Sequence, residues 1–158
     1  MKITLRDHPL LQDLPNRSFA TLMELYESNY ILMRRLAPEL DALPRDNRSI
    51  GRDGVDLYLH LLDRTRYTTG LRLTHYFDPE SQPGNEPDLM IRVYHDARLA
   101  EVMPETPVDR FHFWSGERPE QKSLPWRWEL NRFLNRWLRY CLGRGHVFLP
   151  DRQHASNG

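Results

Sequence analysis

The segment from residue 92 to residue 102 alternates apolar and polar side chains on both sides of Asp96-Ala97. Alternation about so short a connection is typical of a tight β-hairpin. A two-residue turn at Asp96-Ala97 places Arg92 opposite Glu101 on the polar side of the hairpin. Because a shift of one residue would turn every side chain to the other face, the pattern predicts this single register.

A longer alternating segment, Val55–Phe77, predicts another hairpin before this one. The first strand would carry apolar residues at every second position, and so would the second. A three-residue loop at Asp63-Arg64-Thr65 keeps the two apolar faces together. It predicts the cross-strand pairs Leu57–Leu71, Val55–Leu73 and Asp56–Arg72.

Two segments have the three- and four-residue spacing of apolar side chains that is typical of amphipathic helices. The first runs from Ser18 to about Ala37, with Asn16 or Ser18 as its cap and Pro38 at its end. The second runs from Pro125 or Trp126 to Leu142 and ends at Gly143 and Gly145. Its apolar stripe contains Trp126, Leu130, Phe133, Leu134, Trp137, Leu138, Cys141 and Leu142.

This order of elements predicts an α+β fold with an antiparallel sheet of four to five strands built from two hairpins. The N-terminal and C-terminal amphipathic helices flank the sheet and cover one of its faces. The second hairpin consists of strands Asp88–His95 and Arg98–Met103, Val108–Trp114 is the candidate fifth strand, and residues 41–54 are expected to be a charged loop. We expect one domain over residues 1–149 and a frayed tail over residues 150–158.

The composition excludes several classes of protein. A formal net charge of zero gives no overall field that would attract nucleic acid. The single cysteine, Cys141, excludes an internal disulfide and a cysteine-cluster metal site, and its place on the apolar stripe predicts a buried thiol. No segment has the apolar run of a signal peptide or a membrane span, so we expect a cytoplasmic protein.

Four motifs in one order resemble the YqiB family, a group of small proteobacterial cytoplasmic proteins classed as a domain of unknown function. They lie at residues 29–38, 65–69, 93–102 and 131–142, and the similarity spans most of residues 20–146. The resemblance implies no established activity and no catalytic residues.

The polar side of the second hairpin is a candidate ligand-binding site. Arg92, Tyr94 and Glu101 could line a small pocket in which the guanidinium holds an anion. A cross-strand ion pair with a purely structural role explains Arg92 and Glu101 equally, and is the more common case. Arg66, Tyr67 and Thr69 would extend the site if the two hairpins adjoin, although such residues are also ordinary strand formers.

His95, Asp96 and Glu101 are the weak candidates for acid–base catalysis. Adjacent strand residues point to opposite faces, so Asp96 is poorly placed to orient the His95 ring. The sequence contains no phosphate-binding loop, dinucleotide fingerprint or nucleophile elbow. The spacing of the histidines predicts no metal site, and no cofactor is indicated.

Arg132, Arg136 and Arg139 share the polar side of the last helix. Such a row is usually a solvated face, and a docking site for an acidic partner is the alternative. Nucleic acid is a poor fit, because three arginines on a neutral protein make a weak phosphate track.

Together these patterns favour a cytoplasmic, non-enzymatic binding or adaptor protein for a protein partner or a small anionic metabolite. An enzyme acting on a phosphorylated or nucleotide small molecule is the first alternative. An RNA- or membrane-associated protein that uses the basic last helix is the second.

Overall fold

The computed structural model describes residues 18–52, 54–76, 87–106 and 119–150. The described elements follow the predicted α+β order. They are helix α2 (Phe19–Leu36), the 3₁₀ turn η2 (Leu40–Ala42), strands β1 (Asp46–Ile50), β2 (Asp56–Arg64), β3 (Thr68–Tyr76), β4 (Asp88–Tyr94) and β5 (Leu99–Val102), and helix α3 (Leu124–Gly143).

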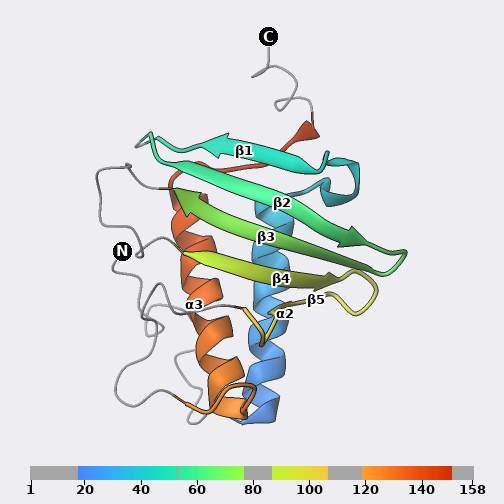
Figure 1. Cartoon of the computed structure of the whole chain (residues 1–158), viewed down its shortest axis with the longest axis vertical. Helices are drawn as coiled ribbons and strands as arrows, with labels where there is room; N and C mark the ends of the chain where they lie inside the picture. Colours follow the sequence, from blue (N-terminus) through green and yellow to red (C-terminus); the bar gives the residue numbers. More distant parts are fainter. Residues whose placement is uncertain (1–17, 53, 77–86, 107–118, 151–158) are drawn as a thin grey trace.

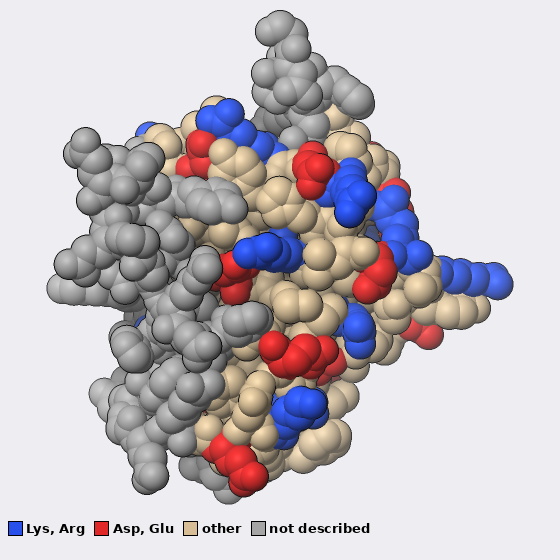
Figure 2. Space-filling view, in the orientation of Figure 1, with Lys and Arg blue, Asp and Glu red and all other residues tan. Residues whose placement is uncertain are grey.

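The five strands form one antiparallel sheet in the order β1-β2-β3-β4-β5. Both helices cover the same face of this sheet, as predicted (Figure 1). On the open face, positive and negative side chains alternate without gathering into a patch of one sign (Figure 2). Cross-strand contacts account for part of this pattern, including Arg48–Asp56 at 2.7 Å and His60–Asp46 at 2.8 Å.

Helices α2 and α3 lie side by side and run in the same direction (Figure 1). Trp128 Nε1 donates to Thr21 Oγ1 near their N-terminal ends, and Asn135 Nδ2 donates to Ser28 Oγ two turns further along both helices. The advance of seven residues on each helix establishes the parallel arrangement. The N-terminal halves of both helices extend beyond β5. There they form a second apolar cluster of Leu22, Leu25, Tyr26 and Trp128.

The main core lies between the sheet and the two helices. The inward-facing leucines of the central strands are completely buried, as are the large side chains of α3. Removing each such side chain from water stabilises the fold by about 1.5–3 kcal/mol. Six of the eight side chains in the predicted apolar stripe of the last helix are at most 1% exposed, namely Trp126, Leu130, Leu134, Trp137, Leu138 and Cys141. The other two, Phe133 and Leu142, are partly buried against the core.

A buried polar network joins the two helices to the edge of the sheet. Asn131 Oδ1 accepts from the backbone N–H of Val102 at 2.8 Å, and Asn131 Nδ2 donates to the Arg127 carbonyl at 2.7 Å. Asn29 Nδ2 approaches Asn131 Oδ1 at 3.4 Å. Asn131 therefore satisfies a backbone donor of β5, the edge strand of the described sheet.

Both helix ends are formed by the residues that the sequence indicates. Ser18 caps α2 by accepting from the Thr21 N–H, and Pro38 follows the C-cap Ala37. At the end of α3, Gly145 adopts φ +84°. The N–H of Gly145 bonds to the Leu142 carbonyl and the N–H of His146 to the Cys141 carbonyl, the paired bonds of a Schellman cap. Gly143, which was also predicted to terminate the helix, is its last helical residue.

The predicted register of the second hairpin is confirmed. Arg92 pairs with Glu101, and Tyr94 pairs with Leu99. The predicted two-residue turn at Asp96-Ala97 is wrong, because the ladder stops at this pair and residues 95–98 form the connection. Arg98 takes a left-handed φ of 57°. Strand β4 therefore ends at Tyr94. The side chain of the next residue, His95, lies on the core side of the sheet.

The predicted register of the first hairpin is wrong. Leu57 pairs with His75 and not with Leu71, while Leu61 takes Leu71 as its partner. The strand continues through the expected loop to Arg64, with a β-bulge between Leu61 and Asp63. The predicted apolar faces are nevertheless correct, because the error is an even number of residues and leaves side-chain direction unchanged.

The prediction of a continuous loop over residues 41–54 is also wrong, because β1 lies within it. The inward positions of β1 are polar, and Asn47 and Ser49 are buried there. Asn47 Nδ2 donates to the Leu59 carbonyl at 3.2 Å, and Ser49 Oγ lies 2.9 Å from His146 Nδ1. The predicted strand Val108–Trp114 and the tail from residue 151 lie outside the described residues.

Candidate functional site

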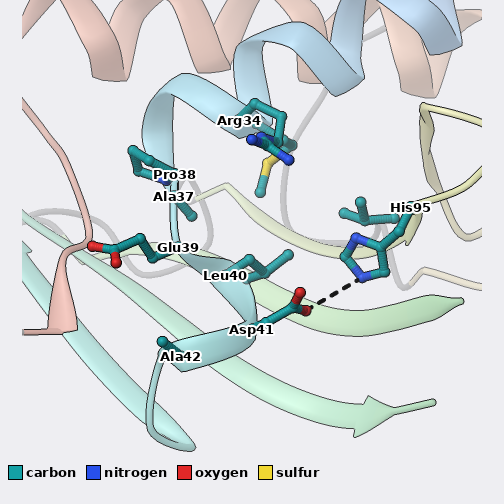
Figure 3. A pocket seen from close by; sticks show the side chains of 10 residues that line it. Arg34, Ala37, Pro38, Glu39, Leu40, Asp41, Ala42 and His95 are labelled. Carbon is teal, nitrogen blue, oxygen red and sulfur yellow. Dashed lines mark ion pairs between the residues drawn. The ribbon is translucent and has the colours of Figure 1, made fainter. Parts of the chain in front are cut away.

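A hollow of about 130 Å³ lies where α2 ends against the sheet (Figure 3). Helix α2 stops before Pro38, and the chain turns through η2 beneath the end of β4. These elements supply a lining of both apolar and charged side chains. The lining residues are Met33, Arg34, Ala37, Pro38, Glu39, Leu40, Asp41, Ala42, Val93 and His95.

His95 enters this hollow because Val93, two residues earlier on β4, faces the core. Its backbone N–H donates to the Tyr67 carbonyl at 2.8 Å, which fixes the end of β4 against the first hairpin. Its Nε2 lies 2.8 Å from Thr69 Oγ1 and 3.8 Å from Asp41 Oδ1. The ring is therefore held from one side, by a buried hydroxyl and a carboxylate.

In the neutral tautomer of His95 that carries its proton on Nε2, both neighbours act as acceptors. A carboxylate accepts hydrogen bonds and cannot donate, and the Thr69 hydroxyl can accept as well. The Nδ1 atom then carries a lone pair, and among the described residues it has no hydrogen-bond partner. His95 thus offers an acceptor to whatever occupies the hollow.

Arg34 approaches the hollow from the last turn of α2, facing Asp41 and His95 across it (Figure 3). Its Nη1 lies 3.5 Å from the Tyr30 hydroxyl, a long contact. Within the described ranges no carboxylate lies at ion-pair distance from this guanidinium. Among the described residues, the Arg34 guanidinium therefore has the Tyr30 hydroxyl as a distant acceptor and no carboxylate partner.

The predicted trio Arg92, Tyr94 and Glu101 lies elsewhere, on the face of the sheet opposite the main core. Tyr94 donates its hydroxyl proton to Glu101 Oε1 at 2.6 Å. The expected Arg92–Glu101 ion pair is not formed, although the two residues are cross-strand neighbours. Tyr94 can reach this carboxylate because it lies on the same face of the hairpin, diagonally across from Glu101: its own cross-strand partner is Leu99, two residues before Glu101.

A further tyrosine shares this carboxylate. Burial raises the pKa of Tyr26 on α2 to about 12, and the charge and hydrogen bonding of Glu101 raise it as well. Arg127 on α3 acts in the opposite direction. Burial and the bond to Glu101 also raise the pKa of Tyr94. This cluster links β5 to both helices, and the hollow described above does not extend to it.

The two hairpins do adjoin, as the wider site requires. Thr69 pairs with Val93, and its hydroxyl is the group that holds His95. Tyr67 is 52% exposed at the tip of the first hairpin, where the Arg66 guanidinium lies 5.3 Å from its ring centroid. Of the six predicted ligand-binding residues, Thr69 contacts the lining residue His95 through its side chain, and Tyr67 contacts it through its backbone carbonyl.

The three weak catalytic candidates are not brought together. His95 faces the hollow, Asp96 is exposed in the following turn, and Glu101 lies at the sheet edge with Tyr94. The carboxylate beside His95 is that of Asp41. Sequence reasoning missed Asp41 and Arg34, because neither has a spacing that relates it to residue 95.

The arginine row on α3 is half-buried and differs from a fully solvated face. Arg132 Nη1 lies 3.6 Å from the buried Glu129 carboxylate, and Arg139 Nε donates to Asn135 Oδ1 at 3.0 Å. Burial lowers the pKa of Arg136, and the charge of Arg132 lowers it further. A role of this row in binding a partner stays a prediction.

The described residues contain no candidate metal site and no candidate membrane span. No group of three or more His, Cys, Asp or Glu side chains in these ranges is placed to hold a metal ion. None of the helices in the same ranges combines the length and the apolar character needed to cross a bilayer.

A family described as a protein of unknown function, DUF1249, matches residues 32–147. The chain belongs to this family. It is 33% identical to uncharacterized protein YqiB of Escherichia coli strain K12 over 135 residues, which are 84% of this chain and 94% of that protein. The YqiB proteins of strains O6:H1 and O157:H7 match to the same extent. No solved structure matches. The resemblance predicted from the four motifs is confirmed. The three polar lining residues Arg34, Asp41 and His95 lie within the residues that match the family.

Proposed function

We propose that this protein is a non-enzymatic binding protein whose ligand is a small anionic molecule seated in the hollow between Arg34 and His95. The observation that carries the proposal is the Arg34 guanidinium at the edge of a cavity, where it has no carboxylate partner among the described residues. A guanidinium offers paired donors in one plane, which suit a carboxylate or a phosphate. We also propose the cytoplasm as its compartment, since a buried free Cys141 requires no oxidising environment.

The size of the hollow limits the ligand. A volume of about 130 Å³ corresponds to roughly four water molecules, at about 30 Å³ each. It is smaller than the usual pocket for a drug-sized molecule, which is about 300–1,000 Å³. The hollow therefore suits a small metabolite, or the charged head group of a larger one whose remainder extends into solvent.

Thermal unfolding in the presence of inorganic phosphate and of simple carboxylates tests this proposal. A ligand at one hundred times its Kd stabilises the folded state by about 2.7 kcal/mol. The stabilisation should disappear in Arg34→Gln and persist in Arg35→Gln, which changes the adjacent exposed arginine of the same helical turn outside the lining. Equal losses in the two variants, or no stabilisation by any ligand with an anionic group, amino acids included, would refute the proposal.

The approach of Asp41 to His95 favours a second candidate function, acid–base catalysis on a phosphorylated small molecule. The carboxylate would orient the ring, and Nδ1 would act as the base. Turnover in a general phosphatase or phosphodiesterase screen, abolished by His95→Asn with the fold intact, would establish this alternative. Binding without turnover by the same protein would reject it.

A further inference from the structure

We infer that the ligand of the hollow is a zwitterion, with a primary ammonium group beside its anionic group, as in a free amino acid. This inference rests on the proposed function and adds the cationic half of the ligand. Its basis is the distribution of charge around the hollow, which is positive at one side only.

The side opposite Arg34 is acidic. Asp41 projects from η2 with 81% of its side chain exposed, and Glu39 precedes it on the same turn. Figure 3 shows the Asp41 carboxylate across the hollow from the Arg34 guanidinium. A purely anionic ligand would be attracted by the arginine and repelled by these carboxylates at similar range.

The end of helix α2 adds to the negative character of this side. The aligned peptide dipoles of a helix leave a partial negative charge of about half an elementary charge at its C-terminus. Helix α2 ends at Leu36, directly beside the lining residues Ala37 and Pro38. A proline cannot donate a backbone N–H, so the chain offers no donor to an anion at that position.

His95 completes the same side as an acceptor. With its proton on Nε2, toward Thr69 and Asp41, its Nδ1 lone pair can accept from an ammonium N–H. An ammonium carries three donors, and the acceptors on this side are Nδ1 of His95 and the carboxylate of Asp41, whereas the Glu39 carboxylate points away from these two groups (Figure 3). The anionic group of the same ligand would then meet the donors of Arg34.

Volume and charge together select the class. Two opposite charges must fit within about 130 Å³, so they must be joined by a short link. An amino acid separates its carboxylate and ammonium by a single carbon, and its side chain can leave through the exposed rim that Arg34, Glu39 and Asp41 form. Binding would depend on both charges at once.

Calorimetry with the full chain tests this inference. The probes are the twenty common L-amino acids, then ethylamine and propionate, which each keep one charge of alanine, and inorganic phosphate. We expect at least one amino acid to bind, and ethylamine, propionate and phosphate each to bind at least tenfold more weakly. Asp41→Asn should weaken the amino acid at least tenfold, whereas Asp96→Asn, a change in the exposed turn beside His95, should leave its affinity unchanged.

Each other outcome has a distinct meaning. If propionate or phosphate binds as tightly as any amino acid, or if Asp41→Asn strengthens anion binding, the zwitterion is wrong and the anionic ligand of the proposed function stands. If ethylamine binds alone, or no probe binds, both proposals fail. Both variants change exposed side chains, and equal thermal midpoints without ligand will verify that each one folds.

Discussion

Replacing Asn131 with alanine tests how the edge of the sheet is held. Asn131 is completely buried, and its Oδ1 is the acceptor for the Val102 N–H at 2.8 Å. Alanine leaves that donor unpaired where Val102 itself is 1% exposed. A buried donor without a partner costs about 1–3 kcal/mol, and the lost contacts to Arg127 and Asn29 add about 1 kcal/mol.

We therefore expect Asn131→Ala to lower the free energy of unfolding by about 2–4 kcal/mol in urea titration. For a chain of this length, that corresponds to a fall in Tm of about 5–15 °C. Glu27→Ala, which removes an exposed side chain of α2, should leave the midpoint unchanged.

Hydrogen exchange localises the effect. A general loss of stability accelerates all core amides alike, so the exchange of the Val102 amide should be compared with that of its cross-strand neighbour Ile91. In Asn131→Ala the Val102 amide should accelerate more. Asn131→Asp retains an acceptor oxygen and should preserve the protection of Val102 relative to Ile91. Unchanged stability, or equal acceleration of the two amides in the alanine variant, would refute this account of the edge.

Three further predictions concern stability. The pKa of Tyr26 is raised to about 12 from an ordinary value near 10, so the stability that its neutral hydroxyl contributes is present below pH 10 and is lost as pH rises through 12. In urea titrations between pH 9 and 12, the free energy of unfolding should fall more steeply for the wild type than for Tyr26→Phe, and equal slopes would contradict this. Gly145→Ala should lower stability by about 1–2 kcal/mol in thermal melts, because φ +84° is left-handed and the new Cβ would lie 3.2 Å from Arg52 Nε; an unchanged melt would show that the cap relaxes. Trp137→Ala should lower the free energy of unfolding by about 3–5 kcal/mol. Trp137→Phe should lower it much less, because Nε1 of Trp137 is buried without a hydrogen-bond partner among the described residues. Equal losses for the two variants in urea titration would contradict this account of Nε1.

The elements that were predicted correctly are those whose pattern is local. The β4–β5 register follows from alternation about a short connection, and both helices follow from an apolar stripe that ends at a proline or at glycines. The Ser18 cap of α2 was one of its two predicted caps, whereas the Ser123 cap of α3 was not predicted. The β2–β3 register failed because alternation fixes which face a residue occupies but not its partner along the strand. The bulge after Leu61 then moved the turn beyond Asp63.

Strand β1 escaped prediction because its inward side chains are polar. Asn47 and Ser49 can be buried because they form hydrogen bonds with the Leu59 carbonyl and His146, respectively. Those partners belong to other parts of the chain. A strand of this kind has no apolar alternation, so its sequence is typical of a loop. Tertiary contacts decide its conformation.

The candidate site shows the same limit. His95 stood out in the sequence, and its adjacent Asp96 was the obvious carboxylate, yet strand geometry directs the two apart. The carboxylate that does approach belongs to Asp41, on a 3₁₀ turn in a segment with no periodic pattern. Thr69 was predicted to extend the ligand-binding site of the second hairpin, and its observed partner is the imidazole of His95. Such groupings arise from the path of the whole chain.

The same-direction pairing of α2 and α3 has a consequence for how the chain reaches its native state. The hydrogen bonds between the helices join residues 102 to 107 positions apart, and the entire sheet is threaded between the two partners. On the ribosome, the first helix emerges long before the last one is synthesised, and its apolar side must wait without its final cover. Folding rate falls as contacts become more distant in sequence, so this protein is expected to assemble slowly and to depend on its C-terminal third for closure.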